Sequence, residues 1–256
     1  MSHLGQSVRS VLTWRRPAGR HTRREVAVAA GFGLLVIIFL GGPGVSLAAA
    51  QPAVMGLDVS SHDPSIEWSS VVSDGGQFAY VKATEGTGFV NPDFAAQYDG
   101  SYQAGLIRGA YHFALPNVSG GAAQASYFVG NGGGWSADGR TLPGALDIEY
   151  DPYGAECYGL SQSAMVSWIT SFADTYQALT TRWPVIYTTD AWWAKCTGDY
   201  SGFASEDPLW LPPGSTLPAD WSFLTFSQYA SHGTFPGDQD TFNGASVRLR
   251  VLATGR

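Results

Sequence analysis

Ala145-Leu146-Asp147-Ile148-Glu149 is an apolar run that carries two carboxylates two residues apart. Alternate side chains of an extended strand share a face, so Asp147 and Glu149 are predicted to project together from the end of a buried strand. Desolvation and mutual repulsion should push their pKa values apart, as glycosidic bond cleavage requires. The alternative is a structural role, in which the strand end binds a cation or caps a loop.

This stretch is one of a series of short apolar runs that alternate with segments of helical periodicity. The predicted strands are 54–59, 78–82, 106–111, 144–148, 185–187, 209–211 and 224–228, and the predicted helices are 64–72, 93–104, 121–129 and 161–179. The alternation favours parallel strands joined by crossovers in a closed barrel. Because the helical pattern weakens after Trp192, we predict an α/β fold, an irregular TIM-like (β/α) barrel with reduced helices in the C-terminal part.

The first fifty residues differ from the rest of the chain. Six arginines precede an apolar segment at 26–40, and small residues end in Ala48-Ala49-Ala50. This pattern predicts a secretory signal peptide cleaved after Ala50, and Thr22-Arg23-Arg24 resembles a twin-arginine signal. The alternative is an uncleaved membrane anchor, because 26–50 reaches bilayer length. We therefore expect residues 51–256 to form one domain that is secreted, extracellular or in the cell wall, or else anchored facing outside.

The predicted exported part is acidic. Residues 1–50 hold six Arg and one Glu, which leaves eight Lys plus Arg against twenty Asp plus Glu, a net charge of −12. This charge disfavours nucleic acid or an anionic membrane surface as a partner, but it is compatible with an uncharged polysaccharide backbone. The membrane enters only through the N-terminal segment, if that segment is not cleaved. We expect a monomer without a cofactor.

The chain has two cysteines, Cys157 and Cys196, both in the predicted exported part. In an oxidising compartment such a pair most simply forms one disulfide, which would join the loop after Glu149 to the segment after Thr188. The alternative is two free thiols. Two cysteines this far apart do not suffice for a metal site.

Carboxylates follow three of the predicted strand ends. Asp58 ends the first strand, Asp147 and Glu149 end the fourth, and Asp238 lies in the closing segment 237–244. The catalytic groups of a closed barrel gather at the carboxyl ends of its strands. A barrel would therefore bring these four acids together although almost 180 residues of chain separate the first from the last.

Six segments in order carry a family resemblance. They are Gly56-Leu57-Asp58-Val59-Ser60, Tyr80-Val81-Lys82-Ala83-Thr84-Glu85-Gly86, Gly109-Ala110-Tyr111-His112-Phe113, Leu146-Asp147-Ile148-Glu149, Tyr187-Thr188-Thr189 and Gln228-Tyr229. Together they resemble the family 25 glycoside hydrolases, the CH-type lysozymes, from Val54 to Gly244. The resemblance implies an N-acetylmuramidase, an enzyme that hydrolyses the β-1,4 bond between N-acetylmuramic acid and N-acetylglucosamine in the glycan strands of bacterial peptidoglycan.

The resemblance also implies catalytic roles. Glu149 matches the general acid and Asp147 its partner, while Asp58 and Asp238 match the other acids of the cleft. Asp240 competes with Asp238 for the last position, and spacing to Phe242-Asn243-Gly244 favours Asp238. Glu149 would stay protonated and Asp147 charged, with retention assisted by the substrate's own N-acetyl group. The competing assignment makes Asp147 a direct nucleophile.

Substrate-binding residues are expected around these acids. The candidates are Tyr111, Glu85, Tyr187, Trp210, Gln228 and Tyr229. Aromatic rings at strand ends can stack on sugars or fill the top of the barrel as core, and Glu85 can bind sugar hydroxyls or pair with Lys82. Two other functions remain open from sequence, a catalytically inactive glycan-binding barrel and a chitin-directed glycosidase.

Overall fold

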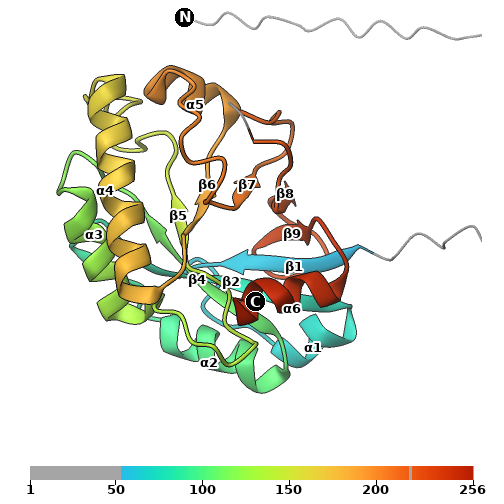
Figure 1. Cartoon of the computed structure of the whole chain (residues 1–256). Helices are drawn as coiled ribbons and strands as arrows, with labels where there is room; N and C mark the ends of the chain where they lie inside the picture. Colours follow the sequence, from blue (N-terminus) through green and yellow to red (C-terminus); the bar gives the residue numbers. More distant parts are fainter. Residues whose placement is uncertain (1–52, 219–220, 256) are drawn as a thin grey trace, which may run out of the picture. The chain divides into compact units, whose positions relative to one another are not determined.

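Eight strands close into a barrel in the computed structural model, which describes residues 53–218 and 221–255 (Figure 1). The strands are β1 (Val54–Val59), β2 (Gly76–Glu85), β4 (Ile107–Phe113), β5 (Ala145–Asp147), β6 (Val185–Tyr187), β7 (Leu209–Leu211), β8 (Phe226–Ala230) and β9 (Asp238–Phe242). They follow one another in this order, and β1 closes the ring by pairing with both β2 and β9. A short strand, β3 (Phe89–Val90), extends β2 as a hairpin. The predicted α/β barrel and its seven predicted strands are confirmed.

The closing strand β9 is antiparallel to both of its neighbours, which corrects the expectation of an all-parallel barrel. Only residues 231–237 separate it from β8, too few for the crossover that a parallel strand needs. At Gly237 the backbone turns with φ of +68°, and a Cβ there would lie 2.4 Å from the Asp58 carbonyl oxygen. The reversal places the first residue of β9, Asp238, beside Asp58 near the end of β1.

Helices cover the barrel mainly in its first two thirds. They are α1 (Trp68–Ser73), α2 (Phe94–Ala104), α3 (Gly121–Phe128), α4 (Gln162–Thr180), α5 (Asp190–Thr197) and α6 (Ser246–Thr254), and a π-helical turn at Val129–Gly133 follows α3. The helix predicted at 64–72 begins four residues later than expected, and α5 and α6 are short helices that the pattern did not predict. Between β7 and β8, and between β8 and β9, the described residues contain no helix.

Aromatic side chains fill the interior of the barrel. Phe78, Tyr80, Trp210 and Phe226 belong to one buried cluster, and the ring centroids of Tyr80 and Trp210 lie 4.9 Å apart. Space for these rings comes from missing side chains, since a Cβ at Gly109 would lie 2.3 Å from the Tyr80 ring. The interior of the barrel is therefore a packed core.

The helices pack against the outside of the barrel in two places. Figure 1 shows α3 and α4 side by side on one flank of the barrel, where Phe128 and Phe172 are fully buried. Helix α6 packs Leu249 and Ala253 into the same cluster as the start of β1 and the end of β9. It therefore covers the end of the barrel opposite the carboxyl ends of the parallel strands.

The predicted signal peptide or anchor, residues 1–50, lies outside the described residues and stays a prediction. Among the residues that the structure describes, none of the helices combines the length and apolar character needed to cross a membrane.

Candidate active site

A cavity of about 390 Å³ opens at the carboxyl ends of the parallel strands. Its lining includes Asp58, Asp147, Glu149 and Asp238, the four acids expected to meet. We call this space, lined also by Tyr111, Tyr187, Trp210 and Gln228, the mouth cavity. The barrel closure thus brings together Asp58 of β1, Asp147 of β5, Glu149 just after β5, and Asp238 of β9.

Asp147 and Glu149 lie on one side of the chain at the end of β5. Leu146 before the pair and Ile148 between the two acids are fully buried in the core under α4, whereas both acids are only partly buried and line the mouth cavity. Backbone bonds fix this arrangement, since the Ile148 amide donates to the Tyr187 carbonyl at 2.9 Å. The predicted alternation of the two faces is confirmed.

The two carboxyls interact strongly. Burial raises the pKa of Asp147 well above its ordinary value, and the Glu149 charge raises it further. Burial also raises the pKa of Glu149, with Asp238 adding to the effect and Lys82 opposing it. Two such close acids titrate as a pair, and both pKa values are raised. The expectation that Glu149 carries the proton and Asp147 the charge stays a prediction.

One carboxyl oxygen of this pair lacks a hydrogen-bond donor in the described part of the chain. Oδ1 of Asp147 is buried and has no hydrogen-bond partner among the described residues. A buried carboxylate oxygen without a donor is costly unless a ligand supplies one. Asp147 lines the mouth cavity, so a donor group bound there would lie beside this side chain.

The other two acids are joined by an amide. Nε2 of Gln228 donates to Oδ2 of Asp58 and to Oδ2 of Asp238, both at 3.0 Å. Oε1 of Gln228 accepts from the Tyr187 hydroxyl at 3.0 Å, which fixes the orientation of the amide. Burial and the Asp238 charge raise the pKa of Asp58 to about 7.

Asp240 is the acid that the sequence analysis rejected in favour of Asp238. It lies two residues beyond Asp238 on β9, is fully buried, and accepts from Nε1 of Trp210 at 3.0 Å. Burial and the nearby Asp58 raise the pKa of Asp240 well above its ordinary value. Asp240 therefore lies buried beside the acids of the mouth cavity, where a charge on its carboxyl is disfavoured. The spacing of two residues on one strand was the available signal.

The predicted sugar-contacting residues fall into three groups. Tyr111, Tyr187, Trp210 and Gln228 line the mouth cavity, and the Trp210 ring meets that of Tyr187 edge to face at 5.2 Å. Glu85 lines a neighbouring cavity instead. Tyr229 is exposed and lines neither cavity.

Lys82 is the lysine of the mouth cavity, and its place in the site was not predicted. Its Nζ lies 2.6 Å from Oε2 of Glu85, which confirms the pairing alternative for Glu85. Nζ also lies 4.9 Å from the centre of the Phe113 ring. Its charge lowers the pKa of Asp147 and Glu149, which partly offsets the effect of burial.

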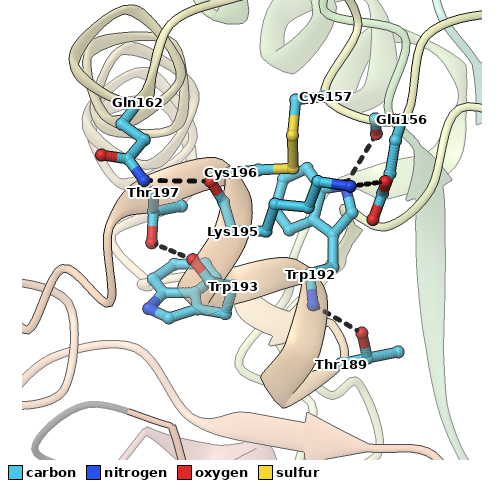
Figure 2. The surroundings of a disulfide bond; sticks show 9 residues. All are labelled: Glu156, Cys157, Gln162, Thr189, Trp192, Trp193, Lys195, Cys196 and Thr197. Atoms are coloured by element: carbon cyan, nitrogen blue, oxygen red, sulfur yellow. Dashed lines mark hydrogen bonds and ion pairs between the residues drawn. A yellow bond between two sulfur atoms is a disulfide. The ribbon is translucent and has the colours of Figure 1, made fainter.

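The predicted disulfide is present and holds the loop that follows Glu149. Cys157 in this loop is bonded to Cys196 in α5, with Cα atoms 5.4 Å apart (Figure 2). Beside it, Lys195 forms an ion pair with Glu156, and Nε1 of Trp192 donates to the Glu156 carbonyl at 3.0 Å. The loop is thus fastened to α5 by one covalent and two polar contacts.

We expect Cys157→Ala/Cys196→Ala to lower the free energy of unfolding by about 4 kcal/mol, because the bond closes a loop of 39 residues. Urea unfolding followed by tryptophan fluorescence measures the change. Wild-type protein unfolded in the presence of a thiol reductant is the matched control and should unfold at the same urea concentration as the variant. Equal midpoints for the oxidised wild type and the variant would contradict the prediction.

The model of the family described as glycosyl hydrolases family 25 matches residues 57–238, a span that contains all four acids of the mouth cavity. The chain belongs to this family. It is therefore a glycoside hydrolase, and the expected family 25 membership is confirmed.

This family 25 enzyme is similar in sequence to several lysozymes and muramidases. Lysozyme M1 of Streptomyces globisporus is 52% identical over 214 residues, which cover 80% of this chain and 73% of that protein. The N,O-diacetylmuramidase of Chalaropsis sp is 44% identical over 79% of this chain and all of that protein. The bacterial lysozyme structure from Streptomyces coelicolor is 51% identical with a TM-score of 0.78, covering 80% of this chain and 98% of that one.

Proposed function

We propose that this family 25 enzyme is a lysozyme that hydrolyses the β-1,4 bond between N-acetylmuramic acid and N-acetylglucosamine in bacterial peptidoglycan. The observation that carries the proposal is the Asp147 and Glu149 pair in the mouth cavity, with raised pKa values and a buried oxygen that lacks a donor. Relatives named lysozyme and N,O-diacetylmuramidase support the substrate.

In the proposed mechanism Glu149 gives its proton to the oxygen that leaves the anomeric carbon. The carbonyl oxygen of the substrate's N-acetyl group bonds to the same carbon from the opposite face and forms a cyclic intermediate. Asp147 accepts the N–H of that amide through its unpartnered oxygen, which orients the amide and stabilises its developing positive charge. Water then opens the ring, Glu149 takes back a proton, and the original configuration is retained.

The remaining acids, Asp58 and Asp238, would stabilise the charge of the transition state without forming or breaking a bond. Positive charge develops on the sugar ring in the transition state, and Asp58 and Asp238 present carboxyl groups to the mouth cavity where that ring would lie. The Gln228 amide holds both in place through its two hydrogen bonds. Trp210 and Tyr187 would contact the apolar face of the ring.

We also propose that the enzyme acts outside the cell. The disulfide between Cys157 and Cys196 suits an oxidising compartment. The basic and apolar pattern of residues 1–50 suits export, with cleavage after Ala50 preferred to retention as an anchor. A monomer without a cofactor suffices for this chemistry, because one chain supplies all the acids.

Mass spectrometry of fragments released from purified peptidoglycan tests the proposed bond. After borohydride reduction we expect the new ends to carry reduced N-acetylmuramic acid. Reduced N-acetylglucosamine at those ends would contradict the proposal, as would faster cleavage of chitin offered in parallel. Release of no fragments would favour the inactive glycan-binding barrel. Proton NMR of the first product should detect the β-anomer if configuration is retained.

A further inference from the structure

A second cavity, of about 550 Å³, adjoins the mouth cavity. The two share Glu149, Lys82 and Phe113 in their linings, whereas Asp147 lines only the mouth cavity. We call the second space the side cavity; its other walls include Glu85, Phe89, Tyr150 and Tyr153. Glu149 therefore lies at the boundary between the two spaces.

The position of the proton donor Glu149 indicates in which direction a bound glycan strand runs across the two cavities. A general acid must contact the oxygen that bridges the two sugars of the cleaved bond. The sugar whose N-acetyl group meets Asp147 must occupy the mouth cavity, because Asp147 lines that space alone. The sugar on the other side of the bridging oxygen then extends past Glu149 into the side cavity.

The walls of the side cavity suit a sugar ring. Phe89, Tyr150 and Tyr153 are exposed, and Tyr153 is 71% accessible to solvent although it is a large aromatic residue. Aromatic faces with polar groups at their edges are typical surfaces for stacking against pyranose rings. A volume of about 550 Å³ is sufficient for one such residue.

Tyr153 is held in place despite its exposure. Its hydroxyl donates to Oε1 of Glu85 at 2.7 Å, and Oε2 of Glu85 lies 2.6 Å from Nζ of Lys82. Burial acts to raise the pKa of Glu85, but hydrogen bonds from Lys82 and Tyr153 keep it below its ordinary value, so Glu85 remains an ionised acceptor. The Tyr153 amide also donates to Oδ1 of Asp151 at 2.8 Å.

We propose that the side cavity binds the leaving N-acetylglucosamine residue of the glycan strand, with Tyr150 and Tyr153 as its stacking surface and Glu85 as the residue that positions Tyr153. This inference rests on the proposed function. It assigns Tyr153 and Glu85 to recognition of the leaving sugar and not to the sugar that is attacked.

The test compares two substrates that share the attacked sugar. In peptidoglycan the leaving group is a sugar. In the β-fluoride of the disaccharide N-acetylglucosaminyl-N-acetylmuramic acid the leaving group is a fluoride ion, so no sugar occupies the side cavity. We expect Tyr150→Ala/Tyr153→Ala to lower kcat/KM on peptidoglycan at least about tenfold and to leave the fluoride rate within about twofold of wild type. Tyr153→Phe keeps the ring and should lose less than Tyr153→Ala.

Phe223→Ala is the matched control, because Phe223 is an exposed aromatic residue, 62% accessible, that lines neither cavity. Thermal melting of each variant checks that folding is intact. Equal losses on both substrates, or an unchanged rate on peptidoglycan, would overturn the side-cavity proposal while the lysozyme proposal stands. A wild-type enzyme that exposes N-acetylglucosamine reducing ends would instead overturn the lysozyme proposal and the leaving sugar assigned with it.

Discussion

Glu149→Gln is expected to lower kcat on peptidoglycan by about 100- to 10,000-fold, the usual contribution of a positioned general acid. Gln is similar in size to Glu and keeps the packing beside Ile148, but it has no proton to give to the leaving oxygen. The disaccharide fluoride should be affected much less in its first step, because fluoride leaves without full protonation. Initial rates on the two substrates separate these effects.

Glu156→Gln is the matched control for this variant. Glu156 lies in the same loop as Glu149, pairs with Lys195 on the surface and lines neither cavity. Its replacement should leave both rates near those of wild type. A Glu149→Gln enzyme that degrades peptidoglycan at the wild-type rate would remove Glu149 from the proton-donor role.

The pH profile follows from the same pair. Burial raises the pKa of Glu149 and of Asp147, so the proton that catalysis needs stays bound at pH values where an exposed carboxyl has lost it. Activity should therefore fall on the alkaline side, as pH rises through the upper pKa of the pair. Glu149→Gln should abolish this alkaline limb in the residual activity.

The barrel was predictable because each parallel strand is a short apolar run, and such runs identify buried strands without an alignment. The closing segment 237–244 was given no strand bounds, because the aspartates at both ends of Asp238-Gln239-Asp240 have low strand propensity. Gln239 and Asp240 are nevertheless fully buried, since the barrel closure and hydrogen bonds such as Trp210 to Asp240 stabilise them there. Tertiary contacts decided this strand.

The candidate site divides in the same way. The acids at strand ends were predictable because topology alone brings strand ends together. The partners that orient them were not, since the bond from Gln228 to Asp58 joins residues 170 positions apart. Tyr153 carried no sequence signal, because an exposed tyrosine in a loop has neither periodicity nor a motif, and its contact with Glu85 depends on how the loop folds back.

Asp147→Asn should lower kcat by about 100- to 1,000-fold, in line with the loss of one preorganised electrostatic contact in a desolvated site. The amide keeps the shape of the side chain and still offers an oxygen to the N-acetyl N–H, but the negative charge that stabilises the positively charged cyclic intermediate is gone. Repulsion between two ionised carboxylates is removed as well, so Glu149 should lose its proton at lower pH. The alkaline limb of the variant should shift to lower pH.

The two candidate roles of Asp147 predict different behaviour of a truncated side chain. If Asp147 orients the N-acetyl group, added azide should not restore Asp147→Gly, because the internal nucleophile is the amide of the substrate. If Asp147 attacks carbon, azide should restore activity and yield a glycosyl azide of inverted configuration. We expect no azide product by mass spectrometry, with Asp99→Asn on the exposed face of α2 as the charge control. A glycosyl azide would make Asp147 the nucleophile and exclude substrate assistance.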